Sequence, residues 1–116
     1  MCIRDRTGGV HASALYSKDG VELAFAEDVG RHNAMDKVIG VCAERDCEFG
    51  ETFAVSTGRL SGDIVLKIAR VGIPIVASIS SVLSSGVEIA EYTGVTLIGF
   101  VWGNSCLLYT SDAADE

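Results

Sequence analysis

Two short segments of this chain concentrate polar and charged side chains that could form a binding site. Residues 27–33 hold two carboxylates, an arginine, an imidazole and an amide around one glycine, and residues 56–63 hold three hydroxyl groups and an arginine on a glycine-containing backbone. Each segment follows an expected strand and leads into an expected helix, where free backbone N–H groups and the helix dipole favour anions. We therefore expect one phosphate-binding pocket, whose candidate residues are Asp28, Arg31, His32, Asn33, Ser56, Thr57, Gly58, Arg59 and Ser61.

The same residues also allow a purely structural interpretation. Asn33 or Ser61 can merely cap a helix, and the two arginines can be solvated or paired with nearby carboxylates. Neither segment matches a Walker loop or a G-x-G-x-x-G fingerprint. Polar residues at both strand-to-helix turns nevertheless favour a binding site. His11 is expected either to reach the same region or to be an ordinary strand histidine.

Turn and cap signals predict the elements that position these segments. Asp19-Gly20 is a strong hairpin signal between two short apolar segments. Apolar residues at three- and four-residue steps predict a helix from Asn33 to about residue 46. A second helix begins near Ser61 and ends at Gly72, and a capping-box pattern at residues 85–88 opens a third that ends at Gly94.

The order of elements predicts the fold class. It is an α/β fold, a three-layer sandwich in which helices cover both faces of a mixed, mainly parallel sheet, because the later strands are apolar on both faces. The expected strands are residues 11–17, 21–26, 52–57, 73–79 and 95–101.

Composition narrows the function classes. The length of 116 residues suits one small domain. With a formal net charge of −7, the chain lacks the overall electrostatic attraction that drives binding to nucleic acids or anionic membranes. Its longest mainly apolar stretch, residues 73–79, is far below the roughly 20 residues that span a bilayer. We therefore expect a cytoplasmic protein without a nucleic-acid or membrane partner.

The two ends differ from the patterned sequence between them. Residues 1–6 (M-C-I-R-D-R) and residues 105–116, which end in C-L-L-Y-T-S-D-A-A-D-E, resemble translations of opposite strands of one sequencing adapter. We expect the authentic domain to be residues 7–104, incomplete at both ends. Cys2 and Cys106 are then not expected to take part in the chemistry of the domain. Cys42 is expected to be a buried thiol, and Cys47 stands at the negative end of its helix, which disfavours a thiolate.

Three motifs give the chain a resemblance to a known family. They are T-G-G-V-H-A-S-A-L at residues 7–15, E-D-V-G-R-H-N-A-M-D-K at residues 27–37 and S-T-G-R-L-S at residues 56–61, followed by L-I-G-F-V at residues 97–101. Together they resemble the formate dehydrogenase accessory sulfurtransferase (FdhD) family over essentially all of residues 7–104. Their order and spacing agree with the C-terminal domain of that family.

The resemblance implies a cytoplasmic, homodimeric sulfurtransferase with a fold similar to that of cytidine deaminases. It takes sulfur from a cysteine desulfurase as a persulfide and delivers it to the bis(molybdopterin guanine dinucleotide) molybdenum cofactor of formate dehydrogenase, with GDP as a partial mimic of that cofactor. The sulfur-carrying C-x-x-C loop of the family lies upstream, so no catalytic cysteine is expected here. The resemblance also assigns cofactor contacts to Phe100, Val101, Trp102, Gly103 and Asn104.

Two other functions are alternatives to sulfur transfer. A zinc-dependent nucleoside deaminase needs a Glu two residues after His32 and a C-x-x-C after the third strand, and both are missing, so we expect no zinc. A non-catalytic guanine-nucleotide-binding module is equally compatible with the pocket residues. Trp102 and the turn at residues 81–83 depart from the family pattern and weaken the site assignment at the C-terminal end.

Overall fold

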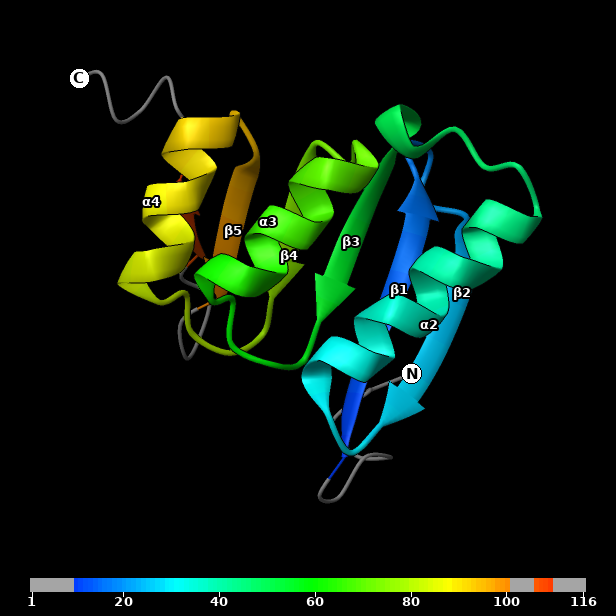
Figure 1. Ribbon diagram of the computed structural model, residues 1–116, viewed down its shortest axis with the longest axis horizontal. Helices are drawn as coiled ribbons and strands as arrows, with labels where there is room; N and C mark the ends of the chain where they lie inside the picture. Colours follow the sequence, from blue (N-terminus) through cyan, green and yellow to red (C-terminus); the bar gives the residue numbers. More distant parts are fainter. Residues whose placement is uncertain (1–9, 101–105, 110–116) are drawn as a thin grey trace.

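The computed structural model describes residues 10–100 and 106–109 and places them in one mixed sheet with three α-helices (Figure 1). In chain order the elements are β1 (His11–Ser17), β2 (Glu22–Asp28), α2 (Arg31–Glu44), the 3-10 turn η1 (Phe49–Glu51), β3 (Thr52–Ser56), α3 (Gly62–Val71), β4 (Ile75–Ser78), α4 (Ser84–Thr93), β5 (Thr96–Phe100) and β6 (Cys106–Tyr109).

The sheet combines a parallel centre with antiparallel edges. Its strand order is β2-β1-β3-β4-β5-β6. The parallel pairs are β3–β4 and β4–β5, whereas β1 runs antiparallel to both β2 and β3, and β6 runs antiparallel to β5. The expected α/β class with a mixed sheet is confirmed, but parallel pairing is limited to the central strands. Strand β6 lies in the segment that resembles adapter sequence.

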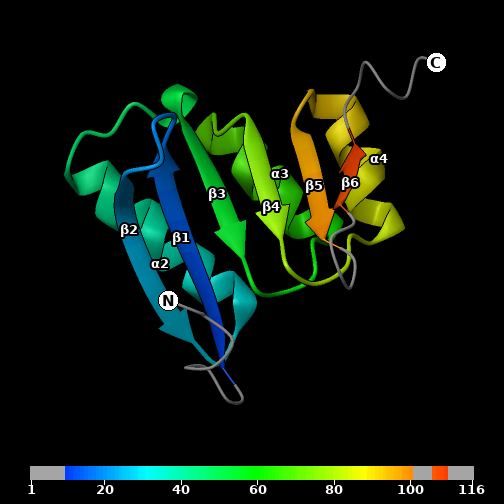
Figure 2. The same ribbon diagram turned by 180° about the vertical axis from the view of Figure 1, so that it is seen from behind.

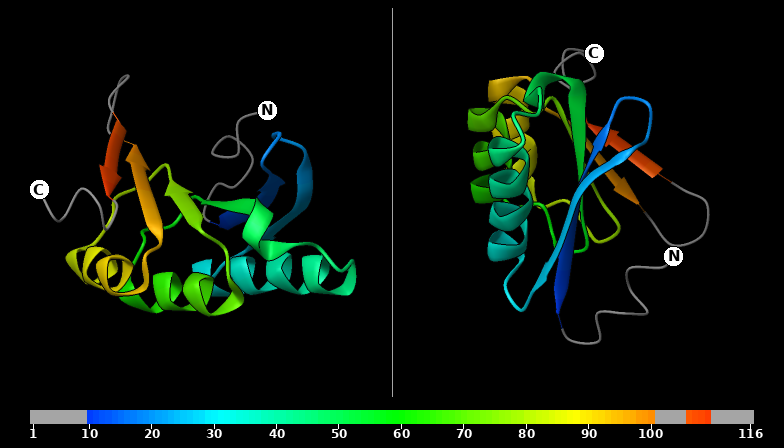
Figure 3. Two further views of the ribbon diagram at one scale, coloured as in Figure 1. Left: turned by 90° about the horizontal axis from the view of Figure 1, so that it is seen from above. Right: turned by 90° about the vertical axis from the view of Figure 1, so that its right-hand side faces the viewer.

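All three helices lie on the same face of the sheet, as the view from above shows (Figure 3). Seen from behind, the strands stand in front and the helices behind them (Figure 2). The expectation of helices on both faces was therefore wrong for the described residues. The reason is the strand order, because the crossovers β2-α2-β3, β3-α3-β4 and β4-α4-β5 all move in one direction across the sheet. Right-handed crossovers in one direction place their helices on one face.

Local signals in the sequence match the observed turns. Gly20 has a φ of +87° in the β1–β2 hairpin, and Gly72 and Gly94 adopt left-handed φ values of 99° and 86° where α3 and α4 end. The capping box is not formed, because α4 begins at Ser84 after the N-cap residue Leu83, which makes no side-chain cap. Ser85 Oγ instead accepts a hydrogen bond of 3.1 Å from Gly62 N–H, in the first turn of α3.

The hydrophobic core lies between the sheet and the helices. Alternate strand residues such as Leu15, Ala54 and Leu97 point into it, and helix residues such as Met35 and Ile68 cover them. On the opposite face, the rings of Tyr16 and Phe53 stack with centroids 5.3 Å apart. None of the helices in the described ranges has the length and apolar character needed to cross a bilayer.

Truncation of a core side chain should lower stability. Ile68 is 0% exposed, so Ile68→Ala removes buried methyl groups and leaves a cavity, and we expect a loss of about 2–5 kcal/mol in the free energy of unfolding. Urea denaturation followed by circular dichroism measures this loss. Tyr92 is 91% exposed, so Tyr92→Ala serves as the control and should change stability by no more than about 0.5 kcal/mol. Equal effects of the two substitutions would contradict the placement of α3.

Candidate functional site

Three helix N-termini meet at one edge of the sheet. Strands β2, β3 and β4 end at the lower edge of the molecule in Figure 1 and lead into α2, α3 and α4. The first turns of these helices therefore present their free backbone N–H groups and the positive ends of their dipoles to the same region. An anion at this edge is favoured by several backbone dipoles, although the chain as a whole is acidic.

The two polar segments singled out in the sequence touch each other through Arg31 and Gly58. A Cβ atom built on Gly58 would lie 2.7 Å from Arg31 Cβ and 2.8 Å from Arg31 Cδ, so the arginine side chain lies directly against the glycine backbone. Such distances leave no space for a side chain. Arg31 Nε is buried and has no hydrogen-bond partner among the described residues. The contact brings the first residue of α2 onto the loop between β3 and α3.

Two serine hydroxyl groups fix the backbone of this loop. Gly58 N–H donates a hydrogen bond of 3.0 Å to Ser56 Oγ, and Ser78 Oγ donates one of 2.7 Å to the Gly58 carbonyl. Ser78 Oγ also accepts a bond of 2.9 Å from Ser80 N–H in the loop before α4. Ser78 was not predicted as part of the site, because a serine at the end of an apolar strand carries no distinctive signal.

Thr57 connects the same loop to β1. Its Oγ1 accepts a hydrogen bond of 2.9 Å from Ala12 N–H, and its N–H donates one of 3.0 Å to the Ala12 carbonyl. His11 Nδ1 lies 3.5 Å from Thr57 Oγ1. His11 therefore stands beside the loop, where its ring contacts Thr57, and this contact fits both alternatives that the sequence left open.

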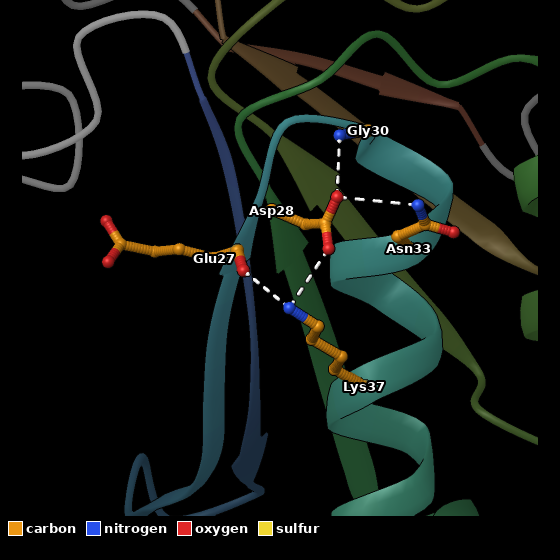
Figure 4. A network of polar contacts seen from close by, with 5 residues as sticks. All are labelled: Glu27, Asp28, Gly30, Asn33 and Lys37. Atoms are coloured by element: carbon orange, nitrogen blue, oxygen red, sulfur yellow. Dashed lines mark hydrogen bonds and ion pairs between the residues drawn. The ribbon is translucent and has the colours of Figure 1, made fainter.

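Asp28 is the centre of a polar network at the start of α2 (Figure 4). Its Oδ1 accepts hydrogen bonds from Gly30 N–H at 3.0 Å and from Asn33 Nδ2 at 3.4 Å, and its Oδ2 forms an ion pair of 3.0 Å with Lys37 Nζ. Lys37 Nζ also donates to the Glu27 carbonyl at 3.0 Å. The Gly30 hydrogen bond, followed by that from Lys37, lowers the pKa of Asp28 from 3.8 to about 2.

This network corrects the structural interpretation of Asn33. Helix α2 begins at Arg31, and its N-cap residue is Gly30, so Asn33 lies inside the helix and does not cap it. Asn33 and Asp28 bind each other instead. Lys37 was missed as a member of the site, although its position one turn after Asn33 is the spacing at which helix side chains become neighbours.

His32, Arg59 and Ser61 lie at the same edge, in or just before the first turns of α2 and α3. Burial, followed by the nearby charges of Lys67 and Arg31, lowers the pKa of His32, which favours its neutral imidazole. Arg59 is exposed. Ser61 occupies the N-cap position of α3 without a side-chain cap, and its buried Oγ has no hydrogen-bond partner within the described part of the chain.

Part of the prediction falls outside the described residues. Val101, Trp102, Gly103 and Asn104 lie in the undescribed gap, and for Phe100 the structure describes only the backbone, in β5. Over the ranges that are described, no group of three or more His, Cys, Asp or Glu side chains is placed to hold a metal ion.

Comparisons with known proteins place this geometry in context. Residues 2–114 match the model of the FdhD/NarQ family. The chain is 48% identical over 105 residues to the sulfur carrier protein FdhD of Sulfolobus acidocaldarius, covering 90% of this chain and 42% of the relative. It is 45% identical over 106 residues to the protein of the same name from Mycobacterium tuberculosis, covering 90% of this chain and 38% of the relative.

A solved structure is similar as well. It is a crystal structure described as that of a formate dehydrogenase accessory protein from Desulfotalea psychrophila, with a TM-score of 0.79 and 37% sequence identity. The match covers 88% of this chain and 45% of that chain. The chain thus spans less than half the length of these relatives, and the edge with the three helix N-termini lies within the shared part.

The Asp28 network should make stability depend on pH. Asp28→Asn removes the charge that Lys37 pairs with, so we expect the substituted protein to melt at a lower temperature than the original at about pH 6. The pKa of Asp28 is lower in the folded state than in the unfolded state. The stabilisation that its carboxylate gives is therefore complete above the unfolded pKa and is lost as the pH falls from about 4 through about 2. Thermal denaturation between pH 6 and pH 2 tests this, and a constant difference in melting temperature would contradict it.

Proposed function

The chain belongs to the FdhD/NarQ family, and we propose that it forms the nucleotide-binding part of a sulfur carrier protein that serves formate dehydrogenase. In this proposal the whole protein acts in the cytoplasm as a homodimer. It accepts a persulfide sulfur from a cysteine desulfurase and passes it to the bis(molybdopterin guanine dinucleotide) molybdenum cofactor, which is the substrate. Relatives named as sulfur carrier proteins support the role of carrier.

The observation that carries the proposal is the meeting of Arg31 with the loop before α3, at the edge where three helices begin. The cofactor is an anion with a diphosphate in each guanine dinucleotide. Guanidinium groups and helix N-termini both bind phosphate oxygens in proteins. We infer that Arg31, Arg59 and the first turns of α2 and α3 hold a diphosphate.

The neighbouring residues fit a nucleoside beside the phosphates. Asp28 is ionised over the physiological pH range and keeps acceptor capacity beyond its present partners, and the Asn33 amide offers a donor and an acceptor. A guanine or ribose edge presents the complementary groups. The neutral imidazole of His32 can donate or accept a hydrogen bond without adding charge.

A non-catalytic guanine-nucleotide-binding module remains the alternative function, because the same contacts serve both. Sulfur transfer distinguishes the two. A carrier needs an accessible thiolate on a mobile segment, and the family resemblance places that C-x-x-C loop upstream of residue 7. A carrier loop joined to this domain supports sulfur delivery, and a longer protein without one favours the module.

Removal of either arginine should weaken GDP binding. A hydrogen bond to a charged group contributes roughly 1.5–3 kcal/mol, so Arg31→Ala and Arg59→Ala should each raise the dissociation constant for GDP by about tenfold or more. Isothermal titration calorimetry measures the constant. Arg70 lies in the last turn of α3, at the opposite end of the helix, so Arg70→Ala is the matched control and should bind GDP as the original chain does. Unchanged affinity in both site variants would refute the assignment.

The described thiols should not carry sulfur. Burial, followed by a hydrogen bond with Cys47, raises the pKa of the fully buried Cys42 to about 11, so little thiolate exists at neutral pH. After incubation with a cysteine desulfurase and cysteine, alkylation and mass spectrometry should find no persulfide on Cys42 or Cys47. Stoichiometric labelling of either residue would contradict this assignment, whereas labelling of upstream cysteines in a longer version would support it.

A further inference from the structure

Three serines form a buried row across the centre of the sheet. Ser13 on β1 pairs in register with Ser56 on β3, and Ser56 pairs with Ser78 on β4. Register partners on adjacent strands point to the same face. Because Ser56 and Ser78 lie two residues after the core residues Ala54 and Val76 on the same strands, they point to the face that the helices cover. All three serines are fully or almost fully buried.

Two members of this serine row form hydrogen bonds with the loop before α3, and the third, Ser13, forms none within the described residues. Ser56 accepts from Gly58 N–H and Ser78 donates to the Gly58 carbonyl, so the polar groups of this residue are fixed from both sides. Ser78 also accepts from Ser80 N–H, which couples the loop before α3 to the loop before α4. Ser13 Oγ has no hydrogen-bond partner among the described residues.

The loop needs this support because its central residue is a glycine. Arg31 lies too close for any side chain at position 58, and glycine alone restricts the backbone very little. Two hydrogen bonds with buried hydroxyl groups select one orientation for the two peptide units that flank Gly58, one through its N–H and one through its carbonyl. That orientation sets the position of Arg59 and of the first N–H groups of α3 before any ligand arrives, which lowers the entropic cost of binding.

We propose that Ser56 and Ser78 are positioning residues that preorganise the loop before α3 for the phosphate groups of a guanine nucleotide. The inference rests on the proposed nucleotide-binding function and adds the residues that shape its phosphate half. Neither serine touches the ligand in this arrangement. Both act through the backbone of Gly58, Ser56 on its N–H and Ser78 on its carbonyl. The nucleoside half of the site, at Asp28 and Asn33, does not depend on them.

The test compares Ser78→Ala and Ser56→Ala with Ser13→Ala in the whole chain. All three substitutions remove one buried hydroxyl group from the same row, but only the first two remove a hydrogen bond to Gly58. The probes are GDP, titrated by calorimetry, and guanosine, titrated by NMR. We expect the dissociation constant for GDP to rise about threefold to tenfold in Ser78→Ala and Ser56→Ala, since one hydrogen bond has a modest net effect. Guanosine affinity should stay unchanged.

A second readout needs no ligand. Amide hydrogen exchange at Gly58 and Leu60 should become faster in Ser78→Ala and keep its original rate in Ser13→Ala. Ser13→Ala should also keep the GDP affinity and should not lower the melting temperature, because a buried hydroxyl group without a partner gives no hydrogen-bond stabilisation and carries a desolvation cost. A merely structural role of Ser78 would lower GDP and guanosine affinity together.

Each result supports or overturns the inference. Selective loss of GDP affinity with faster exchange at Gly58 supports it. Binding of GDP by the original chain and by both variants with equal affinity overturns the inference while leaving the proposed function intact. Parallel loss of GDP and guanosine affinity, or an equal effect in Ser13→Ala, also overturns it. Failure of the original chain to bind GDP refutes the proposed function, and the positioning role falls with it.

Discussion

The close approach of Arg31 to Gly58 is the constraint on which the site depends. The first residue of α2 lies on the loop that follows β3, and a Cβ atom at position 58 would lie 2.7 Å from the arginine. The contact joins two segments that are well separated in the sequence. It also explains why the loop requires glycine together with hydroxyl groups on both sides, since the residue that permits the approach gives the backbone no rigidity of its own.

The direction in which the chain crosses the sheet explains why all three helices lie on one face. Each of the crossovers through α2, α3 and α4 advances the same way, so handedness places them on one face and their N-termini at one edge. A fold that reversed direction would divide these N-termini between two faces. Here the single direction concentrates the backbone dipoles, and the packing of α4 on α3 through Ser85 and Gly62 links two of the three first turns directly.

Features set by one or two residues could be predicted from the sequence, and features set by distant partners could not. Gly20, Gly72 and Gly94 were predicted as turn or helix-stop positions because a left-handed backbone is a property of the residue itself. The face on which the helices lie depends on strand order, which no local pattern contains. Asn33 resembles a helix cap in sequence, but its actual partner is Asp28, and only the three-dimensional path of the β2–α2 turn selects it.

The net charge of the site depends on which charged groups lie next to one another. A chain with a formal charge of −7 attracts a polyanion only where its carboxylates are already neutralised by their neighbours. Asp28 is such a carboxylate, since Gly30 N–H and the Lys37 ammonium bind its two oxygens, and its charge is therefore largely compensated before a phosphate approaches. Arg31 and the helix dipoles then set the sign of the potential at this edge. In the proposed function, selectivity for a phosphate thus comes from the positions of a few groups and not from the overall charge of the chain, which is acidic.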